Sequence, residues 1–156
     1  MDRKTWNAQQ KVLQRLLIKG EDFSRAIELF LNQHAVLHAA EMAQVDFPTF
    51  EDQVWQGLTE EAARSIPKGA EHSIAWNFWH LARIEDITMN LLVAGAPQLF
   101  EKEGWQSRLR VAERDTGNAM SAGRIAQLSA AVDLTALRAY RTAVGRRTRE
   151  SVKALQ

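Results

Sequence analysis

The chain has 156 residues, of which 46% are hydrophobic and 25% are charged, and its formal net charge is +1. This length and composition are typical of one globular domain with its own core, and they argue against a disordered chain. The sequence has no cysteine. This excludes disulfides, thiolate metal sites and cysteine nucleophiles, and leaves His, Asp and Glu as possible metal ligands.

Neither a signal peptide nor a membrane span is predicted. The N-terminus MDRKTWNAQQ lacks an apolar run, and no segment approaches the ~20 apolar residues of a membrane helix. We therefore expect a cytoplasmic protein with no membrane partner.

After residue 100, Lys and Arg outnumber Asp and Glu eleven to six. The arginines lack interleaved aromatic residues, so we expect a solvated helix face and no nucleic-acid partner.

The first two predicted helices span residues 4–18 and 22–45. At about 100° per residue, His34, His38 and Glu41 fall on one apolar arc of the second helix. Their i, i+4, i+7 spacing predicts that all three point inward in one row. Two imidazoles on adjacent helical turns can bind the same metal ion.

The third predicted helix spans residues 71–95, the longest stretch with unbroken helical periodicity. On its apolar arc His80 is the metal-capable group, among Ile74, Phe78, Leu81, Ile84, Ile87, Leu91 and Leu92. The opposite side, predicted to face solvent, carries Arg83, Asp86 and Asn90. Trp79 falls toward this polar side, so we predict that a twofold dimer covers its indole.

The last long helix is predicted to start after Asp133, beyond a partly helical crossover over residues 97–130. Its inward stripe carries Leu134, Leu137, Arg141, Val144, Thr148, Val152 and Leu155. An unpaired buried charge is costly. Arg141 therefore predicts an inward carboxylate partner, Glu41 or Glu85, and it is also the candidate cofactor-contacting residue.

Several familiar chemistries are absent. There is no GxxxxGK[ST] phosphate loop, no GxGxxG, no GxSxG and no HExxH. What remains is a predicted zinc or nickel site on His34, His38 and His80. Three neutral imidazoles leave one coordination position open for water. Glu41 or Glu85 is the candidate catalytic base or a partner of the ligands.

Residues 72–76 (HSIAW) and 79–86 (WHLARIED) resemble the second bundle helix of the DinB-like, damage-inducible superfamily, which includes the YfiT-type proteins. Residues 137–145 (LRAYRTAVG) are similar to its last helix. The resemblance implies an all-α fold, an antiparallel four-helix bundle with a long crossover, as a single domain over residues 1–156. It also implies, in many members, a homodimer and a divalent metal held by three histidines.

His80 matches the family's histidine on the second helix. The family's other two ligands form an HxxxH pair on the last helix, and this chain has no histidine there. We expect His34 and His38 to replace that pair. Some branches of the family are metal-dependent hydrolases or thiol-dependent transferases, which implies a small-molecule or thiol substrate. The alternative is a metal-free, stress-associated binding protein whose His, Glu and Arg residues form a polar core network.

Overall fold

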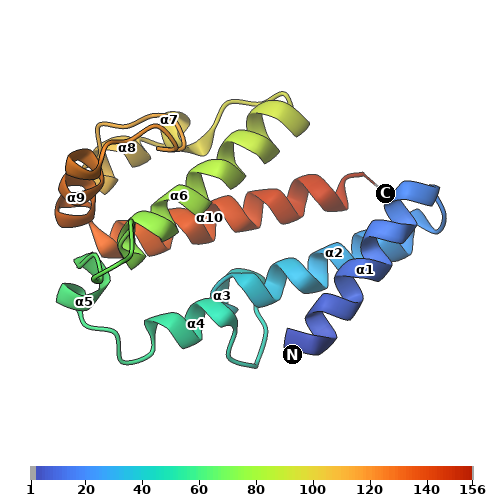
Figure 1. Cartoon of the computed structure of the whole chain (residues 1–156). Helices are drawn as coiled ribbons and strands as arrows, with labels where there is room; N and C mark the ends of the chain where they lie inside the picture. The colour runs from blue at the N-terminus through green and yellow to red at the C-terminus, as the bar shows by residue number, and fades with distance from the viewer. Residues whose placement is uncertain (1–2, 156) are drawn as a thin grey trace. The chain divides into compact units, whose positions relative to one another are not determined.

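The computed structural model describes residues 3–155 of the chain (Figure 1). Within these residues every regular element is helical and there is no strand, which confirms the predicted all-α class. The chain divides into two compact units. The first contains Met1–Trp55 and Arg149–Gln156, and the second contains Gln56–Thr148. Among residues 3–155, none of the helices combines the length with the apolar composition that a membrane span requires.

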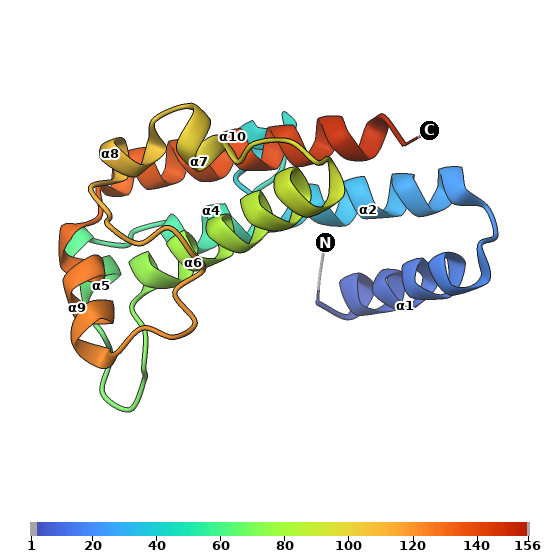
Figure 2. The same ribbon diagram turned by 90° about the horizontal axis from the view of Figure 1, so that it is seen from above.

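The first unit is built on an antiparallel pair of helices, α1 (Arg3–Lys19) and α2 (Phe23–Leu37), drawn in blue in Figures 1 and 2. The turn between them uses Gly20 at a φ of +64°. The pair is held together by buried Leu13, Ala26 and Leu29, with Val12, Leu16 and Phe30 packed around them. Asp22 caps α2 by accepting a hydrogen bond from the Arg25 N–H at 3.1 Å.

The second predicted helix is shorter than expected. α2 ends at Leu37, and His38 adopts an extended conformation with φ −104° and ψ 168°. Two short helices follow, α3 (Ala40–Ala43) and α4 (Phe50–Trp55). The Asp52 carboxylate accepts hydrogen bonds at 3.1 Å from the N–H groups of Ala40 and Thr49, so it ties the chain after His38 to the start of α4. A continuous helix to residue 45 was therefore a wrong prediction.

The second unit contains the other helices of the described chain. They are α5 (Glu60–Arg64), α6 (Ile74–Asp86), the π-helix η1 (Ile87–Val93), α7 (Leu99–Lys102), α8 (Trp105–Leu109), α9 (Ala122–Ala131) and most of α10 (Leu134–Lys153). Ser73 begins α6: its hydroxyl accepts the Trp76 N–H at 3.0 Å and donates to Ser129 at 2.7 Å. The last turn of α10, from Arg149, belongs to the first unit.

The predicted inward face of residues 71–95 is wrong for several of its residues, although Phe78 is buried as predicted. Arg83 and Asp86 are fully buried and Asn90 is 1% exposed, whereas Leu81 is 49% and Ile84 38% exposed. The prediction placed polar and charged residues toward water. In the structure these residues are buried, because they hydrogen-bond to one another and to other buried groups. The α-helix also becomes a π-helix at Ile87, so the 100° spacing does not continue.

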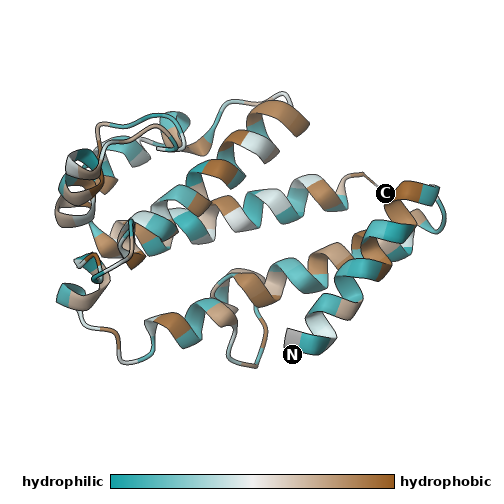
Figure 3. Cartoon of the chain, in the orientation of Figure 1, coloured by the Kyte–Doolittle hydropathy of each residue, from teal (hydrophilic) through white to brown (hydrophobic). Residues whose placement is uncertain are grey.

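Trp79 is also misplaced by the wheel, since its side chain is 0% exposed. It packs against Gly117, where an added Cβ would lie 2.6 Å from the Trp79 ring. The exposed-indole argument for a dimer therefore does not hold. Large exposed apolar residues lie instead at the end of η1, where Leu92 is 71% exposed and the ribbon is brown in Figure 3.

The centre of the second unit is a buried polar network around Asp86. Its carboxylate accepts hydrogen bonds from Arg83 Nη1 (3.3 Å), Tyr140 Oη (2.6 Å), Asn90 Nδ2 (2.7 Å), Leu99 N (3.0 Å) and Phe100 N (2.9 Å). Arg83 also donates to Tyr140 Oη, to the Gln98 side chain and to the Arg114 carbonyl. The network thus joins α6, the start of α7 and α10.

The predicted stripe of α10 is largely confirmed. Its buried members are Leu137, Arg141, Val144, Thr148 and Val152, while Leu155 is 53% exposed.

Candidate functional site

Two of the predicted metal ligands lie side by side in the first unit. His34 occupies the last turn of α2 and His38 follows its end, with exposures of 9% and 3%. Their ring centroids are 4.4 Å apart, and a ring nitrogen of each lies within 4.8 Å of the other. Phe30 stacks on His34 with a centroid distance of 5.7 Å. The structure therefore supplies two adjacent, nearly buried imidazoles.

The geometry of this pair fits two positions of a metal site. Two nitrogens bound tetrahedrally to zinc at 2.0–2.1 Å lie about 3.3 Å apart. The ring nitrogens of the pair lie within 4.8 Å of one another, so the two imidazoles are near this spacing. Imidazole is a good ligand for zinc and nickel, and the phenyl ring of Phe30 stacks on His34, one member of the pair.

The predicted position of Glu41 is wrong. It lies on α3 and is exposed, because the break at His38 turns the following residues out of the row that the helical wheel had drawn. Its role as a catalytic base stays a prediction.

His80 and Glu85 lie in the second unit, and both are half-buried. His80 Nδ1 is 2.6 Å from the Thr116 carbonyl oxygen, and its ring stacks on Trp76 at a centroid distance of 4.6 Å. Glu85 Oε1 accepts a hydrogen bond of 2.7 Å from the Thr148 hydroxyl. These contacts fix both side chains, each against a different neighbour.

Arg141 is 5% exposed, as the stripe of α10 predicts, and its guanidinium carbon lies 5.3 Å from the centre of the Phe78 ring. Its predicted pairing with Glu41 or Glu85 stays a prediction. A positive charge stacked on an aromatic face suits contact with an anionic group.

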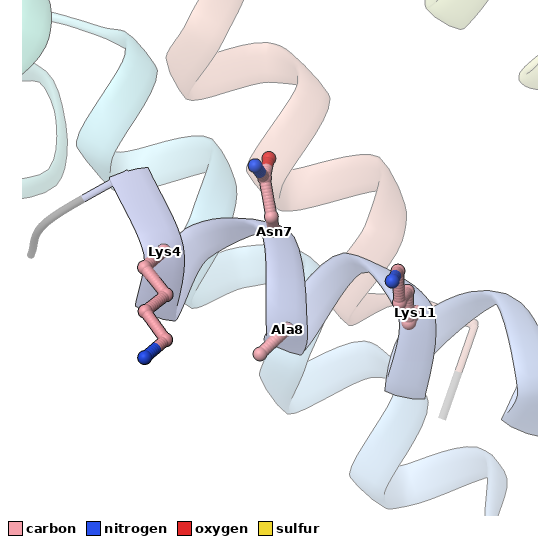
Figure 4. Close-up of a pocket in the computed structure, with 4 residues that line it drawn as sticks. All are labelled: Lys4, Asn7, Ala8 and Lys11. Carbon is pink, nitrogen blue, oxygen red and sulfur yellow. The ribbon is translucent and has the colours of Figure 1, made fainter.

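A hollow of about 520 Å³ beside α1 is lined by Lys4, Asn7, Ala8 and Lys11 (Figure 4). None of these four residues was predicted to belong to a site. The side chains that Figure 4 labels include no His, Asp or Glu, so this hollow does not supply the predicted chemistry.

The sequence profile of the DinB superfamily matches residues 52–156. The chain belongs to the DinB superfamily. No curated protein matches the chain. The matched segment includes the whole second unit, and it leaves α1 and α2 outside. The His34–His38 pair is therefore a feature of the part of this DinB-superfamily chain that the family pattern does not cover.

The sequence patterns missed Asp86 and Tyr140 as buried residues, whereas Thr148 was already on the predicted inward stripe of α10. A signal was present, because Asp86 lies in the segment 79–86 that carries the DinB resemblance, three residues after Arg83. Tyr140 is the only tyrosine of the chain and lies in the second such segment. The segments that carry the resemblance thus contain Arg83, Asp86 and Tyr140 of the buried network in this DinB-superfamily protein. The helical wheel had placed Arg83 and Asp86 on the side predicted to face solvent.

Proposed function

We propose that this DinB-superfamily protein binds a divalent metal ion, zinc or nickel, through His34 and His38. The observation that supports this is the adjacency of the two rings, whose centroids are 4.4 Å apart, at exposures below 10%. Burial of two imidazoles removes polar nitrogens from water, and a shared metal ion would offset part of that cost.

We further propose that the protein is a metal-dependent hydrolase or thiol-dependent transferase. A divalent ion with an open position lowers the pKa of a bound water or thiol. In this proposal Glu85 or Glu41 would serve as the base that takes up the proton, and Arg141 would contact an anionic group of the substrate. The further ligand predicted from the sequence is His80, and that assignment belongs to the same proposal.

The test is metal analysis of protein purified without a histidine tag, combined with melting temperatures in added zinc or nickel. We expect bound metal in the wild type and a raised melting temperature, both lost in His34→Ala and His38→Ala. His72→Ala is the matched control, since His72 is not one of the predicted ligands His34, His38 and His80. A wild type that holds no metal and gains no stability from either ion would overturn the proposal.

Acid should weaken the same site, because an imidazole binds a metal only when it is deprotonated. We therefore expect metal content to fall as the buffer is made acidic, before the protein unfolds. Metal content and circular dichroism measured on the same samples separate the two events.

The second candidate is a metal-free, stress-associated binding protein, and the observation that favours it is the buried hydrogen-bond network of Arg83, Asp86 and Tyr140. Such a network gives a rigid polar core without any ion. This candidate predicts that chelators change neither the melting temperature nor the ligand-binding properties of the protein.

We also propose a homodimer, which the family resemblance implies. Exposed apolar residues such as Leu92, at 71%, are suited to a subunit interface. Light scattering at micromolar concentration tests this, and a protein that stays monomeric at high concentration would contradict it.

A further inference from the structure

Each helix of the α1–α2 pair, in the first unit, carries a row of inward side chains with i, i+3 and i+7 spacing. The two rows consist of Trp6, Gln9 and Leu13 on α1 and of Ala26, Leu29 and Gln33 on α2. Residues with this spacing share one face of a helix. Leu13, Ala26 and Leu29 belong to one buried cluster, so these two faces are the ones that pack together.

The glutamines of the two rows lie in the same layer of the pair. Gln9 precedes Leu13 by four residues and Gln33 follows Leu29 by four residues, so each lies about 6 Å along its helix from the shared cluster. The two helices are antiparallel (Figures 1 and 2), so both displacements point the same way. Trp6, three residues before Gln9, adjoins this layer.

The layer contains polar atoms that make no hydrogen bond with any group of residues 3–155. They are Trp6 Nε1, Gln9 Oε1, Gln33 Oε1 and Gln33 Nε2. Gln33 is only 2% exposed, and burial of an amide without hydrogen bonds is unfavourable. The two glutamines share a layer and still do not bond to each other, which leaves their donors and acceptors available to a third group.

These four atoms indicate the chemistry of that group. Trp6 Nε1 and Gln33 Nε2 are donors, Gln9 Oε1 and Gln33 Oε1 are acceptors, and none of them is charged. The amide of Gln33 is matched by a neutral group that has an acceptor beside a donor, as at the edge of a lactam or a nucleobase. The indole of Trp6 offers a flat apolar surface to a planar ring. Trp6 and Gln9 are half-buried, so the layer is accessible from solvent.

We propose that the α1–α2 pair binds a small, neutral, planar ligand with an amide edge, a lactam or nucleobase ring, through Trp6, Gln9 and Gln33. None of these residues is a predicted metal ligand, so the site is independent of the proposed metal function. All three lie outside residues 52–156, the segment that matches the DinB superfamily. Membership of the family therefore does not imply this site.

The test uses uracil as the probe and the full-length protein labelled for nitrogen–proton correlation spectra. We expect uracil to shift the Trp6 indole N–H and the Gln33 side-chain NH₂ signals until they saturate. Dimethyluracil, methylated on both ring nitrogens, keeps the ring and lacks the N–H donors. It should bind at least about 10-fold more weakly, the effect of losing one hydrogen bond to a buried group.

Variants assign the effect to the layer. Gln33→Leu should weaken uracil binding at least about 10-fold, and Trp6→Phe, which keeps an aromatic ring without the N–H, about 5-fold. Gln14→Leu changes an exposed glutamine of α1 and should bind uracil as the wild type does. Circular dichroism checks that each variant is folded, and Gln33→Met is the second variant should Gln33→Leu not fold.

Several results would overturn the proposal. They are an absence of shifts at millimolar uracil, equal shifts with dimethyluracil, and unchanged affinity in Gln33→Leu. Exchange signals between water and the Gln33 NH₂ that persist at the highest uracil concentration would show that water alone occupies the layer. His38→Ala should still bind uracil, so a failure of the metal function and a failure of this site are distinguishable.

Discussion

The Tyr140 hydroxyl donates a hydrogen bond of 2.6 Å to the Asp86 carboxylate, and both side chains are fully buried. The same hydroxyl accepts a hydrogen bond of 2.9 Å from Arg83. Tyr140 therefore bonds to both members of the Arg83–Asp86 ion pair, whose charged groups also contact each other at 3.3 Å. Changes at Tyr140 should thus report on this buried network.

The first prediction concerns Asp86. Asp86→Ala removes the acceptor of several buried donors and leaves the Arg83 charge without its carboxylate. We expect the free energy of unfolding to fall by about 3–5 kcal/mol, as when one member of a buried ion pair is removed. Urea denaturation measures this. Asp46→Ala, at an exposed aspartate, is the control, and equal losses in the two variants would show that Asp86 is not buried.

The second prediction concerns Tyr140 and alkaline pH. Burial raises the pKa of Tyr140 above its ordinary value of 10.0. The contribution of the neutral Tyr140 hydroxyl to the free energy of unfolding is complete below pH 10. It is lost as the pH rises above 10, because the unfolded chain then releases a proton that the folded chain keeps. We therefore expect wild type to lose stability above pH 10 more steeply than Tyr140→Phe.

Tyr140 is the only tyrosine, so absorbance at a phenolate wavelength reports its ionisation directly. Ionisation should appear together with unfolding, monitored by circular dichroism. A phenolate signal that rises near pH 10 while the helices remain intact would contradict the buried hydrogen bonds.

The third prediction concerns Gly117. Its φ of +79° disfavours a side chain, and a Cβ would lie 2.6 Å from the Trp79 ring and 2.9 Å from the Met120 sulfur. Gly57 has a similar φ of +70° with nothing within 4 Å. Gly117→Ala should therefore lower the free energy of unfolding more than Gly57→Ala does. We expect a difference of about 1–3 kcal/mol, which is typical of overpacking. Equal melting temperatures would show that the loop yields without cost.

The fourth prediction concerns Arg141, which is 5% exposed and stacks on Phe78. On the prediction that Arg141 pairs with a buried carboxylate, we expect Arg141→Ala to lower the free energy of unfolding by about 3–5 kcal/mol. Arg147 on the same helix is exposed, so Arg147→Ala should leave the melting temperature unchanged. A melting temperature that is the same for both variants would refute a buried role for Arg141.

The helical wheel succeeded on α10 and failed on α6, for a physical reason. On α10 the buried face is mostly apolar, so burial and hydrophobicity coincide at Leu137 and Val144. On α6 the buried face includes Arg83 and Asp86, whose desolvation is offset by partners more than ten residues away in sequence, such as Gln98 and Tyr140. A pattern within one helix cannot reveal such partners.

The candidate site shows the same limit. The pairing of His34 and His38 could be predicted, because local spacing already brings their rings together. The end of α2 at Leu37 could not, since the break is stabilised by Asp52 from twelve residues beyond Ala40. Glu41 was misplaced as a result. The hydrogen bond from Thr148 to Glu85 was equally hidden, because it joins two separate helices.

The π-helix η1 has one consequence for variation in chain length. Its hydrogen bonds join residues five apart, as from the Ala94 N–H to the Met89 carbonyl at 3.0 Å. A π-turn holds one more residue than an α-turn, so the segment can lose a residue by tightening to α geometry. A homologue one residue shorter within Ile87–Val93 would thus keep the hydrogen bonds from the start of α7 to the Asp86 carboxylate. Loss of a residue from the interior of α6 would instead rotate the two ends of that helix relative to each other.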